Sequence, residues 1–151
     1  MHVALRPSSV EDASALASIL IQTRLQFMPY APSAHTAEET HRWVREILIL
    51  NGGITVAEDR GTVVGLMACS QGEPYRWINQ MAVSPALVGQ GVGTHLLLHA
   101  LRTLRSPIRL YTFQANLGAR RFYERNGFRA VEFTDGQANE EHCPDVLYER
   151  Q

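Results

Sequence analysis

The chain has 151 residues, of which 45% are hydrophobic and 19% charged, with a formal net charge of -1. This composition is typical of one globular domain with a sizeable core, and it excludes a disordered chain. The balanced charge gives no electrostatic footprint for nucleic acid, and the apolar stretches are too short to span a membrane. Because the first residues resemble a strand rather than a signal peptide, and two cysteines make no disulfide framework, we expect a cytoplasmic protein.

The first third of the chain predicts one strand and two helices. The strand is Val3–Arg6, and Ser9 with Asp12 has the pattern of a helix cap. Apolar residues at helical spacing follow: Val10, Ala13, Leu16, Ala17 and Leu20. A capping-box pattern, Thr36 with Glu39, opens the second helix. The apolar face of that helix is predicted to carry Trp43, Val44, Ile47 and Leu48.

The middle of the chain changes to the period of strands. Three strand-like segments, Ile54–Glu58, Thr62–Ser70 and Tyr75–Val83, are joined by short turns. Joins this short predict an antiparallel meander. A third helix is predicted from about Gly91, with one apolar face made of Leu96, Leu97, Ala100, Leu101 and Leu104.

The last third predicts three strands and one helix. The helix runs from Asn116 as its N-terminal cap to Asn126 and ends at Gly127. The strands are Ile108–Thr112, Phe128–Phe133 and Asp145–Arg150. The predicted order is therefore β-α-α-β-β-β-α-β-α-β-β in a single domain over residues 1–151. We expect an α/β (α+β) fold around one central, mixed and mostly antiparallel sheet of about seven strands, flanked by four helices.

The turn before the third helix is the most informative segment. It reads Val88-Gly89-Gln90-Gly91-Val92-Gly93-Thr94, directly after a predicted strand. Glycines allow a tight turn whose N–H groups can approach an anion, and the helix start adds free donors. A Walker loop would need a lysine, which the chain lacks, and the glycine spacing does not match a dinucleotide fingerprint. A turn that only caps the helix remains the alternative.

Two separated motifs together resemble the GNAT superfamily of acetyltransferases, over nearly the whole chain. The family's acetyl-CoA signature, Q/R-x-x-G-x-G/A, aligns with Val88–Gly93, with Val88 in place of the usual Arg or Gln. A second family motif, N-x-x-A-x-x-x-Y followed by Gly-Phe, matches Asn116–Tyr123 and Gly127-Phe128. The resemblance implies an N-acetyltransferase that moves an acetyl group from acetyl-CoA to a primary amine in a ternary complex, without a metal.

The resemblance also implies roles for particular residues. The pyrophosphate of acetyl-CoA would be held mainly by backbone groups of Val88, Gly89, Gln90, Gly91, Val92, Gly93 and Thr94. The backbone of Met81, Ala82 and Val83 would pair with the pantetheine arm like an added strand. Asn116 would contact the cofactor, or cap its helix, or do both. Tyr123 would be the general acid that protonates the departing thiolate, and its alternative is a core aromatic residue.

The general base and the acceptor amine stay open. The strand Tyr75–Val83 has no carboxylate, so Asn79 is a candidate for orienting a water molecule. The other candidate bases are expected to be solvated: Glu73, Glu140, Glu141, His142 and Asp145. Met28–Thr36 and the loop Thr134–Pro144 are expected to form the acceptor pocket, whose acidic residues favour a cationic amine. A non-catalytic acyl-CoA sensor on the same fold is the second reading, and a homodimer is left open.

Overall fold

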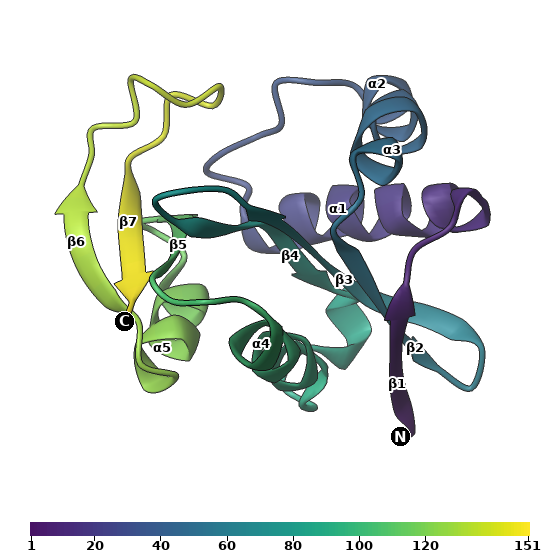
Figure 1. Ribbon diagram of the computed structural model, residues 1–151. Helices are drawn as coiled ribbons and strands as arrows, with labels where there is room; N and C mark the ends of the chain where they lie inside the picture. The colour runs from purple at the N-terminus through teal and green to yellow at the C-terminus, as the bar shows by residue number, and fades with distance from the viewer.

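Seven strands form one sheet in the order β1-β2-β3-β4-β5-β7-β6 (Figure 1). The computed structural model covers residues 1–151. The strands are β1 Val3–Pro7, β2 Ile54–Asp59, β3 Thr62–Gln71, β4 Arg76–Val83, β5 Ile108–Phe113, β6 Arg129–Phe133 and β7 Asp145–Arg150. The helices are α1 Ala13–Phe27, α2 Ala37–Trp43, α3 Ile49–Asn51, α4 Val92–Thr103 and α5 Leu117–Arg125. Short helical turns are η1 Val10–Asp12, η2 Val44–Leu48 and η3 Pro85–Leu87.

The predicted element order and sheet are confirmed. Strands β1 to β4 are antiparallel neighbours, as their short turns require, and β7 is antiparallel to both β5 and β6. Only β4 and β5 are parallel. The helix α4 follows β4 and returns the chain to the end of the sheet where β4 began, so β5 runs in the same direction as β4. The sheet is therefore mixed and mostly antiparallel.

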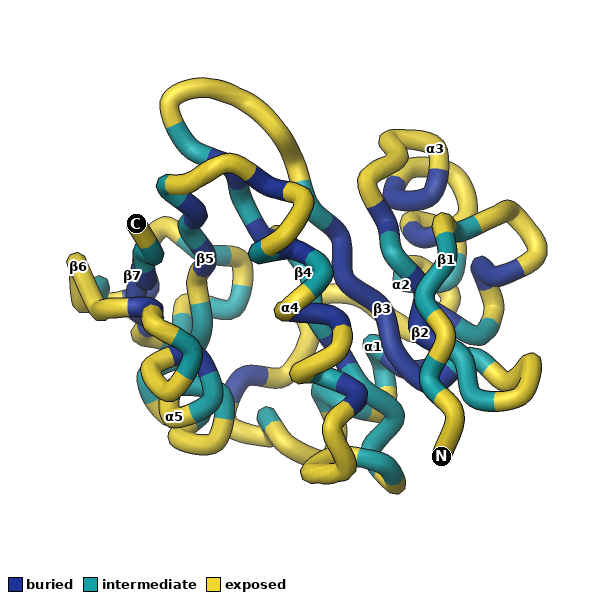
Figure 2. Tube along the Cα trace, turned by 60° about the horizontal axis from the view of Figure 1, so that its bottom comes forward, coloured by how far each residue is buried: buried dark blue, intermediate teal, exposed yellow.

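Helices cover both faces of the sheet, with one apolar cluster on each side. Helix α1 and the α2–α3 segment lie on one face, and α4 and α5 lie on the other (Figure 1). Leu96, Leu97 and Ala100 of α4 are fully buried, as their spacing predicts. Each such leucine contributes about 1.5–3 kcal/mol relative to an exposed one. The central strand β3 is buried over Val64–Ala68, whereas the edge strand β6 is exposed along its length (Figure 2).

Two predictions about helix faces are wrong. Val10 lies in the turn η1 and is 57% exposed, because α1 starts only at Ala13. In the second helix, Trp43 and Ile47 are exposed, and the buried face is Val44, Leu48 and Ile49. The segment Val44–Leu48 is π-helical, so it holds an extra residue that shifts which side chains face the sheet.

The end of α5 agrees with the prediction. Asn116 caps the helix by accepting a hydrogen bond from the Ala119 N–H at 3.2 Å. Gly127 adopts a φ of 91°, which an L side chain rarely tolerates, and Phe128 is buried directly behind it against Tyr123. None of the helices combines the length and hydropathy needed to cross a bilayer.

Candidate functional site

Strands β4 and β5 separate after two residue pairs. They are paired only at Arg76 with Ile108 and at Trp77 with Arg109. Beyond these pairs, β4 is bonded to β3 alone, and its other edge faces a cavity of about 570 Å³, here called the strand cavity. Its walls include Asn79, Gln80, Met81, Leu110, Tyr111, Asn116, Ala119 and Tyr123. Free backbone groups beside a cavity need partners, as an extended ligand chain would supply.

A bulge in β4 decides which residues offer those groups. Ala68 pairs with Gln80 and Cys69 with Ile78, so Asn79 is the extra residue. The Ser84 N–H donates to Val64 O at 2.8 Å, so by strand alternation Ala82 also bonds toward β3. The polar backbone groups of Met81 and Val83 therefore point away from β3, at the free edge of β4. Met81 lines the strand cavity, whereas Val83 O accepts from the Thr23 hydroxyl at 3.4 Å. Ala82 itself is buried and contributes to the core.

The glycine turn joins η3 to α4 with its backbone uncovered. Gly89 has a φ of 85° and Gly91 a φ of 93°, and a Cβ at either position would meet no atom within 4 Å. The backbone N–H groups of both donate to no atom of the chain. The first turn of α4, which includes Val92 and Thr94, adds N–H groups that have no intrahelical acceptor. Such an array of donors suits an anion, and neither lysine nor any other cation stands in the turn.

The other residues of the turn fix its shape and its packing. The Gln90 side chain donates to Ala86 O at 3.4 Å, which draws it back onto η3. Val88 is 52% exposed, and Val92 is buried in the core. A Cβ at Gly93 would lie 3.6 Å from the Phe122 ring, an ordinary van der Waals distance, so the packing of α4 on α5 does not require glycine there. Only Gly89 and Gly91 therefore require glycine for a left-handed backbone.

Tyr123 and Asn79 border the strand cavity from opposite elements. The Tyr123 ring is buried among Phe122, Phe128 and Tyr148, and its hydroxyl donates to Met81 Sδ at 3.4 Å. Burial, and to a lesser extent the neighbouring Cys69, raises the pKa of Tyr123 well above its usual range. The hydroxyl is therefore protonated at every ordinary pH. Asn79 is exposed and donates to Ser70 Oγ at 3.1 Å, which leaves its amide oxygen without a partner.

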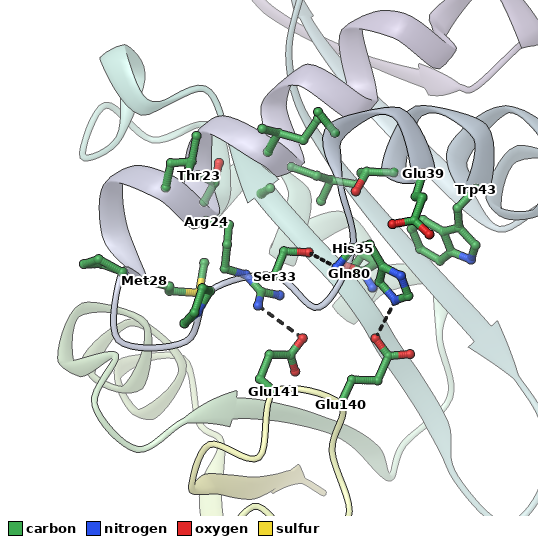
Figure 3. A pocket seen from close by; sticks show the side chains of 18 of the residues that line it. Thr23, Arg24, Met28, Ser33, His35, Glu39, Trp43, Gln80, Glu140 and Glu141 are labelled. Atoms are coloured by element: carbon green, nitrogen blue, oxygen red, sulfur yellow. Dashed lines mark hydrogen bonds and ion pairs between the residues drawn. The ribbon is translucent and has the colours of Figure 1, made fainter.

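A second cavity of about 910 Å³, here called the helix cavity, adjoins the first (Figure 3). It lies between α1, the segment that follows it, and the loop between β6 and β7. Five residues line both cavities: Arg24, Met28, Gln80, Met81 and Glu141. A molecule in the helix cavity can therefore meet a molecule in the strand cavity at this junction.

One ion pair and one histidine–carboxylate contact connect the walls of the helix cavity. Arg24 Nη1 lies 3.2 Å from Glu141 Oε2, and His35 Nε2 lies 2.9 Å from Glu140 Oε2 (Figure 3). Arg24 Nη1 also donates to Ala31 O at 2.9 Å. Both parts of the predicted acceptor pocket thus contribute to one cavity. Arg24 and Trp43 were not predicted as lining residues, because both lie on helices and the cavity forms only when these helices pack against the distant β6–β7 loop.

The candidate bases differ in their surroundings, and two are not solvated as expected. Asp145 is buried and accepts hydrogen bonds from the Thr134 hydroxyl and from Asn139 Nδ2, the latter at 3.1 Å. These bonds hold the β6–β7 loop in place. The Glu141 side chain is only 14% exposed. Glu73 is exposed and lines neither cavity, and Arg105, followed by Arg76, lowers its pKa. Of the carboxylates considered, Glu141 alone is at the junction without being fixed inside the loop.

Comparisons with known proteins agree with this geometry. The sequence model described as the acetyltransferase (GNAT) family matches residues 19–128. Similar solved structures include apo YjaB from Escherichia coli, at 23% identity over 99% of this chain and 97% of that chain, with a TM-score of 0.79. The PaiA N-acetyltransferase from Thermoplasma acidophilum in complex with coenzyme A has 22% identity, coverages of 100% and 99%, and a TM-score of 0.77.

Naa50 from Arabidopsis thaliana, in complex with the bisubstrate analogue CoA-Ac-MVNAL, has 19% identity, coverages of 100% and 99%, and a TM-score of 0.71. The comparison with curated proteins finds no match. At these identities the structural likenesses show the fold, whereas the family model covers more than half of the sequence. With its glycine turn and separated parallel strands, the chain belongs to the GNAT family of acetyltransferases.

Proposed function

We propose that this protein transfers an acetyl group from acetyl-CoA to a primary amine by direct attack in a ternary complex. The observation that carries the proposal is the junction of the two cavities at Met81, beside the free edge of β4. Acetyl-CoA would extend from the glycine turn along β4 through the strand cavity. The amine would enter through the helix cavity. The carbonyl and the amine would then meet beside Tyr123.

The donors present fit the diphosphate of coenzyme A without a charged side chain. Gly89 and Gly91 offer unpaired N–H groups on an open side of the turn, and the helix dipole of α4 favours negative charge there. Met81 and Val83 offer backbone groups to an amide-bearing chain. Asn116, which also lines the strand cavity, caps α5 and leaves its amide nitrogen available for a contact.

The proposed chemistry needs protons to leave the amine and one proton to reach the sulfur. The ammonium would first lose a proton to water, and Asn79, whose amide oxygen has no partner in the chain, would hold such a water. The neutral nitrogen then attacks the acetyl carbon, and the carbon–sulfur bond breaks. Tyr123 supplies a proton to the departing thiolate and regains one from solvent, and the nitrogen loses its second proton to solvent. The raised pKa of Tyr123 keeps its proton available until that step.

The proposed function is tested by following free thiol release from acetyl-CoA across a panel of primary amines, with the acetylated product identified by mass. Binding is measured separately, because acetyl-CoA that binds only the native state must raise the melting temperature. We expect a rise with acetyl-CoA and none with ATP. An equal response to ATP would remove the cofactor assignment. A binding-only acyl-CoA sensor, the second candidate because β4 has no carboxylate, would bind acetyl-CoA without amine-dependent thiol release.

A further inference from the structure

The helix cavity has one apolar wall and one acidic wall. The apolar wall comes from α1, the segment after it and α2, and it includes Leu20, Ile21, Leu25, Met28, Pro32 and Trp43. Leu25 is 73% exposed and Trp43 is 38% exposed, so these side chains offer apolar surface that the fold itself does not bury. Glu140 and Glu141 form the opposite wall (Figure 3).

The charges of this cavity leave no cation free for an incoming anion. Three carboxylates line it, those of Glu39, Glu140 and Glu141, against the single guanidinium of Arg24. Arg24 already pairs with Glu141 and with a backbone carbonyl, and His35 pairs with Glu140. A ligand carboxylate here would meet like charges and find the one guanidinium already paired, which costs affinity. An ammonium group would be attracted.

Glu141 is the carboxylate placed to receive that ammonium. It lines both cavities, and its side chain is 14% exposed, whereas that of Glu140 is 66% exposed. Glu39 lines the helix cavity alone and does not reach the junction, whereas Glu141 reaches it and pairs with Arg24 through Oε2 only. Partial burial strengthens the attraction between Glu141 and a cation relative to the same pair in water.

From these walls and charges we propose that the acceptor is a primary amine carried on an apolar body, with no carboxylate beside the amine, and that Glu141 positions its ammonium. The proposal depends on the acetyltransferase function proposed above and names its substrate class. An arylalkylamine and the α-amine of a peptide with an apolar first residue share this chemistry. A free amino acid does not.

The first test uses the wild-type protein and compares amines that differ by one feature. Phenethylamine and phenylalanine differ by the carboxylate. Each kcat/KM is divided by the fraction of that amine that is neutral at the assay pH, because the two amines differ in basicity. We expect kcat/KM for phenylalanine to be lower by at least about tenfold. The kcat/KM for ethylamine, which lacks the apolar body, should also be lower than that for phenethylamine by about tenfold or more. Phenylalaninyl-alanine amide, compared with phenethylamine, shows whether a peptide or a small amine is preferred within the class.

The second test uses Glu141→Gln, which removes the charge and frees the Arg24 guanidinium. Phenethylamine should then lose kcat/KM while phenylalanine gains it, so that their ratio falls by at least about tenfold. A merely structural role would lower both alike. Glu141→Asp, which keeps the charge, should retain the wild-type preference. The matched control is Glu38→Gln, because Glu38 lies on α2 with an 87% exposed side chain and outside the cavity.

The outcomes separate this inference from the function beneath it. Equal kcat/KM for phenylalanine and phenethylamine would overturn the inference while leaving the acetyltransferase function intact. An unchanged ratio in Glu141→Gln would remove Glu141 from acceptor positioning. No thiol release with any amine, while acetyl-CoA still raises the melting temperature, would overturn the acetyltransferase function and the substrate class with it.

Discussion

The hydroxyl of Tyr123 donates to the sulfur of Met81 at 3.4 Å, and this contact joins α5 to β4 at the rim of the strand cavity. The residue that is predicted to protonate the thiolate therefore contacts the residue whose backbone is predicted to pair with pantetheine. Sulfur is a weak acceptor, so the hydroxyl can change partners at little cost. Burial raises the pKa of Tyr123, and this keeps the group in the acid form.

Tyr123→Phe should lower kcat on the order of 100-fold, the usual range for the loss of a general acid, while the affinity for acetyl-CoA changes little. The ring remains, so its packing against Phe128 is kept. The raised pKa also predicts that ionisation of Tyr123 causes no loss of wild-type rate below about pH 10. Tyr148→Phe is the control: that hydroxyl donates to Glu124 Oε2 at 2.7 Å, on the α5 face, and lines neither cavity. Full activity of Tyr123→Phe would leave water as the proton source.

Gly91→Val should abolish binding of acetyl-CoA, because its side chain would fill the open space beside the turn. The positive φ adds strain of about 1–2 kcal/mol. Gly61→Val separates the two effects, since Gly61 has a φ of 84° with nothing within 4 Å, in the turn between β2 and β3. Both variants should lose similar stability in urea unfolding, and only Gly91→Val should lose calorimetric binding. Retained affinity would mean that the turn is only a helix cap.

Val88→Arg should tighten binding of coenzyme A by about fivefold, or about 1 kcal/mol, because Val88 is exposed beside the turn and a guanidinium can reach an anion there. The gain should shrink as salt is added. Leu98→Arg adds the same charge at an exposed position six residues beyond the start of α4, and it should bind like the wild type. A loss of affinity in Val88→Arg would contradict the backbone-donor arrangement.

Cys69 should be unreactive to iodoacetamide at neutral pH, because burial raises the pKa of its thiol from 9.0 to about 11. The thiolate fraction at pH 8 is then lower than that of an ordinary thiol on the order of 100-fold. A Cys143→Ser variant leaves Cys69 as the only thiol, and labelling is followed by mass from pH 7 to 10. The labelling rate of Cys69 in the folded protein should stay far below its labelling rate in protein unfolded by guanidinium.

The same raised pKa of Cys69 makes a prediction about stability. The folded state disfavours the thiolate form of Cys69. The contribution of this thiol to the free energy of unfolding is therefore complete below pH 9.0 and is lost as the pH rises toward 11. The free energy of unfolding should therefore fall over this interval, and by less in a Cys69→Ala variant. Rapid labelling of the folded protein at pH 8 would contradict the burial of this thiol.

Much of the fold was predictable because its signals are local. The glycines at 89 and 91 stand where the backbone needs a positive φ, and Asn116 with Gly127 marks the two ends of α5 by its own capping chemistry. Short turns required the antiparallel meander. These features depend on neighbours within a few residues, so the sequence alone determined the element order and the candidate anion-binding turn.

The tertiary structure decided the features that make the site. One extra residue in β4, Asn79, sets which backbone groups face the strand cavity, and a bulge leaves no clear signature in a half-buried strand. Trp43, the last residue of α2, lines a cavity wall, although its spacing predicted a core residue, and the π-helical segment that follows it brings Ile49 into the buried face. Glu141 meets Arg24 across 117 residues of chain, and Glu140 meets His35 across 105. Such contacts depend on the packing of distant segments, which local propensity does not determine.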